Sequence, residues 1–240
     1  MNIIAVTQKG PSKTENEDRI VVGKNIIANG ILQTELSEGV IAIADGVGGN
    51  NAGAVASHFV AEKLTALDSV SMNDFSNINV ELLSHSSSSE EYEKMATTLS
   101  GLAVYHGITQ IFSVGNTRVY SLQGSKYLKQ LTTDDTTLNY LLSTGQLSAE
   151  DAASFDRKNE ITACFGGGSP SLFKIKCNSV EQLASPFMMT SDGVHDYISV
   201  DQMEDIIAEH GMTISACEAM IATARNNGSM DDSSIVLGVI

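Results

Sequence analysis

The sequence predicts an α+β domain, and two observations indicate this class. Short β-branched and apolar segments come in clusters with brief, glycine-containing connections, as antiparallel strands require. Blocks with helical periodicity separate these clusters and do not alternate with single strands. Because no linker, repeat or shift in composition divides the chain, we expect one domain over residues 1–240, with a small polar excursion at about 132–160.

The elements follow from local composition. Strands are expected at residues 2–7, 19–22 and 40–44, where β-branched and aliphatic residues dominate, and residues 8–18 are expected to form a polar loop. A helix is expected at 52–67, where apolar residues recur on one face. The other expected elements are a mostly helical stretch at 73–98, strands at 102–108, 110–114, 118–122 and 127–131, weak helices at 136–143 and 149–154, strands at 161–164, 172–177 and 187–190, helices at 199–209 and 214–225, and a strand at 235–240.

Composition excludes several partners. The chain has 14 basic and 29 acidic residues, a formal net charge of −15, and such a chain repels nucleic acid and anionic membrane surfaces.

The sequence contains no apolar run of about 18 residues and no basic leader followed by an apolar segment, so we expect a cytoplasmic protein without a membrane anchor. Three widely spaced cysteines are expected to be free thiols in a reducing compartment.

Aspartates stand where predicted strands begin or end. Asp45 follows the apolar run 40–44 and precedes glycines, and Asp192 stands in the same way after residues 187–190. Asp231 precedes the closing strand, and the pair Glu17-Asp18 precedes another. A carboxylate at the rim of a buried strand is costly unless it is paired or binds a cation, and oxygen ligands suit Mg²⁺ or Mn²⁺. An Asp-Gly pair by itself is also a common turn, so placement alone leaves a structural role open.

Eight short segments match the motifs of one family in order and at familiar spacing. They are Gly10-x-x-Lys13-x-x-Asn16-Glu17-Asp18, Asp45-Gly46-Val47-Gly48-Gly49, Met95-Ala96-Thr97-Thr98-Leu99, Gly115-Asn116-Thr117-Arg118-Val119-Tyr120, Leu131-Thr132-x-Asp134, Arg157-x-Asn159-x-Ile161-Thr162, Ser191-Asp192-Gly193-Val194 and Asp231-Asp232. Nearly end to end, the chain resembles the metal-dependent protein phosphatases of type 2C (the PPM family), in particular their bacterial branch. One segment alone is weak evidence, whereas the whole set in order is specific.

The resemblance implies a fold and an activity. The fold is a sandwich of two central antiparallel sheets flanked by helices on both faces. The segment at about 132–160 forms a flap. The activity is removal of phosphate from serine or threonine of phosphorylated protein substrates by a monomeric enzyme. Two Mn²⁺ or Mg²⁺ ions activate a bridging water for direct in-line attack on phosphorus.

The resemblance also implies residue roles. Asp45 bridges both metals, the Gly46 carbonyl and Glu17 bind one of them, and Asp18 contacts a metal through water. Asp192 and Asp231 bind the other metal, and Asp231 is preferred to Asp232 because the family uses the first member of this pair.

Two departures from the family pattern bear on activity. Lys13 stands where the family usually has a phosphate-binding arginine; a lysine holds phosphate as a point charge and not bidentately, so weaker substrate binding is expected. Asn116 replaces an aspartate that helps to hold a third metal in bacterial relatives, and a neutral amide is a weaker ligand, so a third metal at Asn116 stays an open question. These departures keep open the alternative of a non-catalytic phosphoprotein-binding or regulatory module. A hydrolase of small phosphoesters also stays open, because its chemistry would be the same.

Overall fold

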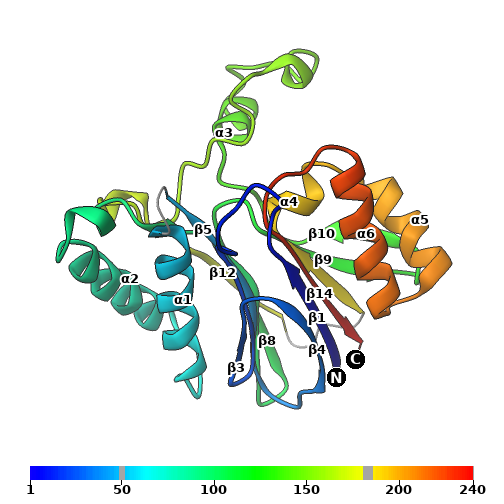
Figure 1. Cartoon of the computed structure of the whole chain (residues 1–240), viewed down its shortest axis with the longest axis horizontal. Coiled ribbons are helices and arrows are strands. Elements are labelled where there is room, and N and C mark those ends of the chain that lie inside the picture. The colour runs from blue at the N-terminus through cyan, green and yellow to red at the C-terminus, as the bar shows by residue number, and fades with distance from the viewer. Residues whose placement is uncertain (49–51, 181–185, 240) are drawn as a thin grey trace.

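Two antiparallel sheets packed face to face form the centre of the computed structural model, which describes residues 1–48, 52–180 and 186–239 (Figure 1). The first sheet has the order β10-β9-β13-β14-β1-β4, and the second has the path β11-β6-β5-β7-β8-β12 with β2 and β3 added beside β5. The strands are β1 Asn2–Gln8, β2 Asp18–Val22, β3 Asn25–Ile27, β4 Gly30–Glu35, β5 Gly39–Val47, β6 Ala96–Thr97, β7 Leu99–Tyr105, β8 Ile108–Val114, β9 Arg118–Gln123, β10 Tyr127–Gln130, β11 Phe165–Gly166, β12 Lys176–Val180, β13 Phe187–Thr190 and β14 Ser233–Val239.

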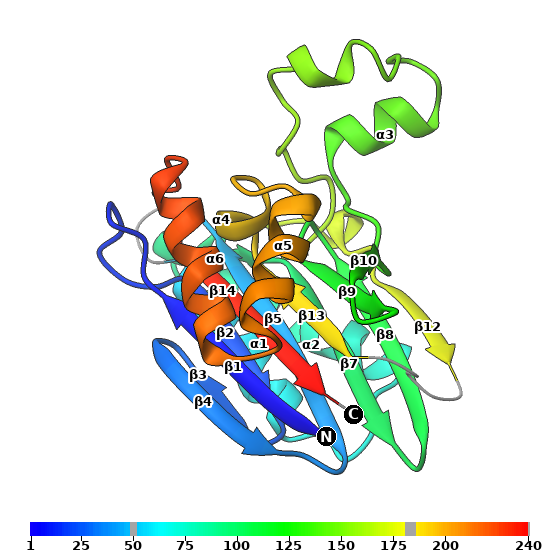
Figure 2. The same ribbon diagram turned by 90° about the vertical axis from the view of Figure 1, so that its right-hand side faces the viewer.

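Helices cover the outer face of each sheet, as Figures 1 and 2 show. Helices α1 (Ala52–Thr65) and α2 (Met72–Ser86) lie on the second sheet, and α4 (Asp192–His195), α5 (Val200–His210) and α6 (Ile214–Asn226) lie on the first. Helix α3 (Thr137–Ser143) stands away from both sheets. Short 3₁₀ turns occur at Glu90–Tyr92, Ala152–Ser154 and Pro170–Leu172. The predicted α+β sandwich with helices on both faces is confirmed.

Three apolar layers hold this arrangement together. Between the sheets, Ile20, Ile43 and Phe187 are fully buried, and they form one cluster with residues of β1 and β14. Phe75 of α2 packs against Phe112 of β8 in the layer under α1 and α2, with ring centroids 4.9 Å apart. The third layer joins the first sheet to α5 and α6. Burial of large apolar side chains on both faces of each sheet therefore provides the main stabilisation.

Several boundaries differ from the sequence prediction. In the stretch 73–98, expected to be mostly helical with a polar break at Ser86 to Ser89, the α-helix ends at Ser86 and only a 3₁₀ turn follows, at Glu90–Tyr92. The end of this stretch is not helical, because Ala96 and Thr97 pair with β5 and β11. A strand at 161–164 is wrong: Ile161 forms an isolated bridge, and strand structure begins at Phe165. The strand expected at 172–177 begins only at Lys176, and strands β3 and β4 were not predicted, since their alternating half-exposed residues give a weak apolar signal.

Strand β5 runs further than its apolar segment. We expected the strand to end before Asp45, but Asp45 and Gly46 belong to it, because β2 pairs with Asp45 and β6 pairs with Gly46. Gly48 follows this strand, whereas Gly49, which the sequence placed in the same turn, lies outside the described residues. Asp192, expected in a turn, is the first residue of α4.

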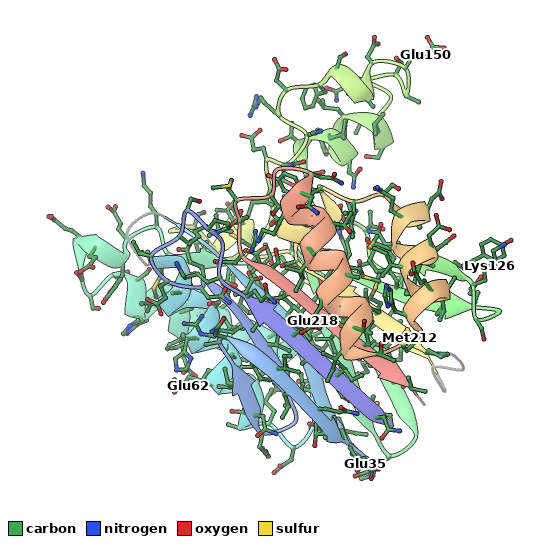
Figure 3. The ribbon with its side chains drawn as sticks, turned by 45° about the vertical axis from the view of Figure 1, so that its right-hand side comes forward. Glu35, Glu62, Lys126, Glu150, Met212 and Glu218 are labelled. Carbon is green, nitrogen blue, oxygen red and sulfur yellow. The ribbon has the colours of Figure 1, made fainter. Side chains whose placement is uncertain are left out.

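The segment around α3 projects from the end of the sandwich, with Glu150 near its tip (Figure 3). Its two ends are joined by a bridge between Thr136 and Ile161 and by backbone hydrogen bonds from Thr137 to Glu160 (2.8 Å) and from Thr162 to Asp135 (2.7 Å). The projection therefore begins and ends at one narrow base. In the described ranges, no helix is long and apolar enough to cross a bilayer.

Gly238 of β14 faces the Phe187 ring, and a Cβ at this position would lie 2.1 Å from ring carbons. We expect Gly238→Ala to lower the free energy of unfolding by about 1–3 kcal/mol, because a methyl group there overpacks the layer between the sheets. Denaturant unfolding measures this. The double variant Gly238→Ala/Phe187→Leu, which makes room for the methyl group, should recover part of the lost free energy of unfolding. An equal loss in Gly238→Ala and in the double variant would contradict overpacking against Phe187 as the cause.

Candidate active site

The predicted site residues meet at one end of the sandwich, opposite the two chain termini. The β1–β2 loop, the far end of β5, α4 and the loop before β14 come together there (Figure 1). The antiparallel register of β2 and β5 places Asp18 directly opposite Asp45. Two carboxylates from neighbouring strands are thereby fixed side by side.

Asp18 is a buried carboxylate held by hydroxyl groups. It is 1% exposed, and its Oδ2 accepts hydrogen bonds from Ser191 Oγ at 2.8 Å and from Ser234 Oγ at 2.6 Å. The pKa of Asp18 is raised to about 7: burial is the largest cause, the negative charges of Asp232 and Asp192 add to it, and the hydrogen bonds from the two hydroxyls oppose it. Asp18 is therefore anchored but electrostatically strained when it is ionised.

Asp45 and Asp192 form the centre of the cluster. Burial raises the pKa of Asp45 well above its usual range, and the charges of Asp192, Asp18 and Asp231 add to the effect. Burial and Asp231 likewise raise the pKa of Asp192, but its contacts with Asn116 and Asp45 oppose this. Asn116 Nδ2 donates to Asp192 Oδ2 at 3.0 Å. The pKa values of both carboxyls are therefore raised, and the Asn116 amide partly offsets this at Asp192 by favouring its ionised form.

Lys13 connects the β1–β2 loop to the cluster. Its Nζ lies 2.6 Å from Glu17 Oε2 and 2.9 Å from Asp231 Oδ1. Burial lowers the pKa of Lys13, but the hydrogen bonds and charges of Glu17 and Asp231 outweigh burial and raise it above its usual value. Lys13 is thus a permanently charged cation between two of the predicted metal ligands.

The structure separates the two neighbouring aspartates before β14. Asp232 is 3% exposed, and its carboxylate accepts the backbone N–H groups of Gly10 and Glu17, each at 2.7 Å. The Asp231 side chain is about half exposed, and Arg225 of α6 holds its backbone carbonyl. Asp232 is therefore occupied in fixing the β1–β2 loop, whereas Asp231 is free to exchange its ionic partner.

Two glycines let the backbones approach one another in the site. A Cβ on Gly46 would lie 2.2 Å from the Gly53 carbonyl oxygen and 2.7 Å from the Glu17 carbonyl oxygen. A Cβ on Gly193 would lie 1.8 Å from the Asp232 carbonyl oxygen. Any side chain at either position would push apart the elements that carry the carboxylates.

The structure thus brings together all the predicted site residues, namely Lys13, Glu17, Asp18, Asp45, Gly46, Asn116, Asp192 and Asp231. Sequence reasoning missed Ser191 and Ser234, although both stand beside predicted ligands; a hydroxyl at a buried strand end was the available signal. It also missed the role of Asp232. His195 is buried in α4, with its Nδ1 2.7 Å from Thr190 Oγ1.

Comparison with known proteins agrees with this geometry. No protein-family model matches the chain. The chain is 28% identical to protein phosphatase PhpP of Streptococcus pneumoniae, over 99% of this chain and 96% of the relative. It is 26% identical to serine/threonine phosphatase stp of Listeria monocytogenes, over 96% and 92% of the two chains. Over nearly its full length, the chain is therefore a homologue of bacterial proteins named as protein phosphatases.

Solved structures of such phosphatases share the fold. The serine/threonine phosphatase PstP/Ppp of Mycobacterium tuberculosis superposes with a TM-score of 0.82 at 22% identity, over 100% of this chain and 99% of that one. The catalytic domain of PstP in complex with two manganese ions superposes with a TM-score of 0.76 at 22% identity, over 99% of this chain and 98% of that one. The fold of this homologue is therefore the fold of known type 2C phosphatases.

The donor chemistry of the site fits hard divalent cations. Its available groups are carboxylate and carbonyl oxygens. Burial and, after it, mutual repulsion raise the pKa values of Asp45 and Asp192, and a bound cation offsets both effects. As the side chains stand in residues 1–48, 52–180 and 186–239, no group of three or more His, Cys, Asp or Glu residues is arranged to hold a metal. Binding therefore requires side-chain adjustment, and Lys13 is one group that must give way.

A cavity of about 190 Å³ lies beside the carboxylates, between the sandwich and the projecting segment. Asn116, Arg118 and His195 line it from the sandwich, and Asn139 and Lys158 line it from the projection. Arg118 is already paired with Asp134, since its Nε and Nη2 donate to both oxygens of that carboxylate. Because Asn116 contacts Asp192, this cavity opens next to the predicted catalytic centre.

The separate positions of Asp231 and Asp232 generate a paired prediction. We expect Asp232→Ala to lower the free energy of unfolding by about 2–4 kcal/mol, since two backbone donors lose a charged acceptor. Asp231→Ala should cost less than about 1 kcal/mol but weaken Mn²⁺ binding at least about tenfold. Chemical denaturation and calorimetric titration measure the two effects. The opposite pattern would show that Asp232 is the ligand.

The raised pKa of Asp18 predicts how the stability of the protein depends on pH when a chelator keeps metal ions away. The native carboxyl keeps its proton up to about pH 7, whereas the unfolded one loses it near 3.8, so stability falls as pH rises between these values. We expect this fall in the free energy of unfolding to be on the order of 2–4 kcal/mol in the wild type and to be absent in Asp18→Asn. Denaturant unfolding at several pH values from about 4 to 8 measures this, and parallel pH curves for both proteins would refute it.

Proposed function

We propose that the chain is a metal-dependent protein serine/threonine phosphatase. The observation that carries this proposal is the convergence of Asp18, Asp45, Asp192 and Asp231, from both sheets, on one end of the sandwich, where their charges oppose one another. Full-length similarity to a protein phosphatase and to a serine/threonine phosphatase supports it. The concentration of like charges is explained if divalent cations complete the site.

Two Mn²⁺ or Mg²⁺ ions are the expected cofactors. Asp45 would contact both, the Gly46 carbonyl and Glu17 would hold one, and Asp192 and Asp231 would hold the other. Once bound, the ions supply an activated water for in-line attack and stabilise the charge on the phosphoryl group. Asn116 donates to Asp192 and is neutral, so we include no third metal.

The chain's own groups orient the reaction. Asp18, fixed by Ser191 and Ser234, is placed to accept a hydrogen bond from a water at the site. Asn116 fixes the orientation of Asp192. Lys13, which is partly exposed between Glu17 and Asp231, is the cation that would donate to a phosphoryl oxygen.

A phosphorylated protein segment fits the surroundings of the site. The cavity of about 190 Å³ and the projecting segment extend the site beyond the phosphate, so residues that flank phosphoserine or phosphothreonine have groups to contact. We therefore propose proteins and not small phosphoesters as substrates. We also propose that the chain forms one domain over 1–240, with a flap-like excursion at about 132–160, and that it is a monomer in the cytoplasm. The free thiols of Cys164, Cys177 and Cys217 are consistent with a reducing compartment, and the net charge of the strongly acidic chain opposes association between copies.

Hydrolysis of a phosphothreonine peptide tests the proposal. We expect turnover with Mn²⁺ or Mg²⁺, none with EDTA, and a fall in kcat of about 10³-fold or more in Asp45→Asn and Asp192→Asn, because each removes a carboxylate that holds the ions. Asp205→Asn, on the exposed face of α5, is the matched control and should keep full activity.

A panel of nucleotides and sugar phosphates, run beside the peptide, distinguishes the substrate classes. Faster turnover of those small esters would favour the phosphoester hydrolase. Folded protein that binds Mn²⁺ and turns over neither class would instead indicate a phosphoprotein-binding module.

A further inference from the structure

Lys13 lies inside the carboxylate cluster and not beside it. Its Nζ contacts Glu17 Oε2 at 2.6 Å and Asp231 Oδ1 at 2.9 Å, and its side chain is 30% exposed. Glu17 belongs to the β1–β2 loop, and Asp231 belongs to the loop before β14, far away in sequence. One ammonium group therefore bridges the two loops that enclose the site.

The two partners of Lys13 come from both proposed metal positions. Glu17 is expected to bind the metal that Gly46 holds, and Asp231 is expected to bind the metal that Asp192 holds. A carboxylate oxygen that lies under 3 Å from an ammonium nitrogen and accepts its hydrogen bond is a poor ligand for a metal ion. The ammonium group and the metal ion would repel one another at short range. Lys13 and divalent metal are thus rivals for the same oxygens.

The loop around Lys13 is fixed, whereas its side chain is not. Asp232 holds the backbone N–H groups of Gly10 and Glu17, and Lys13 N donates to Gly10 O at 3.1 Å in a turn between them. The lysine stem is long and partly exposed, so the ammonium group can leave the cluster without moving the backbone that carries Glu17.

We propose that Lys13 is a built-in counter-cation that competes with divalent metal for Glu17 and Asp231, so that metal binding displaces its ammonium group and makes it available to phosphate. The inference rests on the proposed function and adds an order of events to it. In the metal-free protein Lys13 balances the charge of the cluster; after metal binding the same group faces the substrate. Phosphate capture by Lys13 then depends on prior metal binding.

Calorimetric titration of Mn²⁺ into the full-length protein, without substrate, tests the competition. Lys13→Met keeps most of the stem and removes the charge, and we expect its dissociation constant for Mn²⁺ to fall roughly five- to thirtyfold. Lys13→Arg keeps the charge and should stay within about threefold of wild type. Lys126→Met makes the same change in net charge at the distant β9–β10 turn (Figure 3) and should leave binding unchanged, because salt screens remote charges.

A second measurement separates competition from a simple structural role. Thermal unfolding in EDTA should show Lys13→Met less stable than wild type, and saturating Mn²⁺ should close that gap, since metal then replaces the lost cation. Inorganic phosphate should bind wild type measurably in Mn²⁺ and at least about fivefold more weakly in EDTA, whereas Lys13→Met should show weak binding in both.

The outcomes are distinguishable. Equal Mn²⁺ affinity in wild type and Lys13→Met, or a stability loss that Mn²⁺ leaves unchanged, would overturn the competition and leave the proposed phosphatase intact. Absence of Mn²⁺ binding to the folded wild-type protein would overturn both. If Lys13→Met is too unstable to purify, Lys13→Gln, which keeps a polar end group, replaces it in the same titration with the same expected tightening.

Discussion

Like charges held together by two well-packed sheets are the constraint on which this structure depends. The β2–β5 register fixes Asp18 opposite Asp45, and the sheet packing brings Asp192 and Asp231 from the other sheet toward them. Asp18 in particular cannot turn to solvent without losing its buried hydrogen bonds from Ser191 and Ser234. The surrounding features, from the Ser191 and Ser234 hydroxyls to Asn116 and Lys13, are responses to that charge.

Stability and activity therefore oppose one another at this end of the molecule. Apolar burial between the sheets stabilises the fold, and part of that stabilisation holds carboxylates in positions where they repel. The strain is useful because a site with unrelieved negative charge binds a divalent cation more strongly than a relaxed one does. Glycines at positions 46 and 193 allow the close backbone contacts that make such concentration possible.

Much of this arrangement could be predicted from the sequence. The fold class and the helices near residues 200–226 follow from periodicity and capping residues such as Ser199 and Thr213. The set of site residues followed from motif order, not from local propensity. The continuation of β5 through Asp45 could not be predicted, because its partners in β2 and β6 are distant in sequence. The different tasks of Asp231 and Asp232 depend on which one the Gly10–Glu17 loop reaches, and only the fold determines that.

The narrow base of the projecting segment has an evolutionary consequence. Its two ends are closed by the Thr136–Ile161 bridge and the flanking backbone hydrogen bonds, so residues beyond this base make the cavity wall without supporting the sandwich. Length and composition there can drift, since loop closure costs little more when a loop lengthens. A lineage could thus exchange this segment to acquire new targets while inheriting an unchanged chemical centre, which lets one ancestral hydrolase diversify by altering a single appendage.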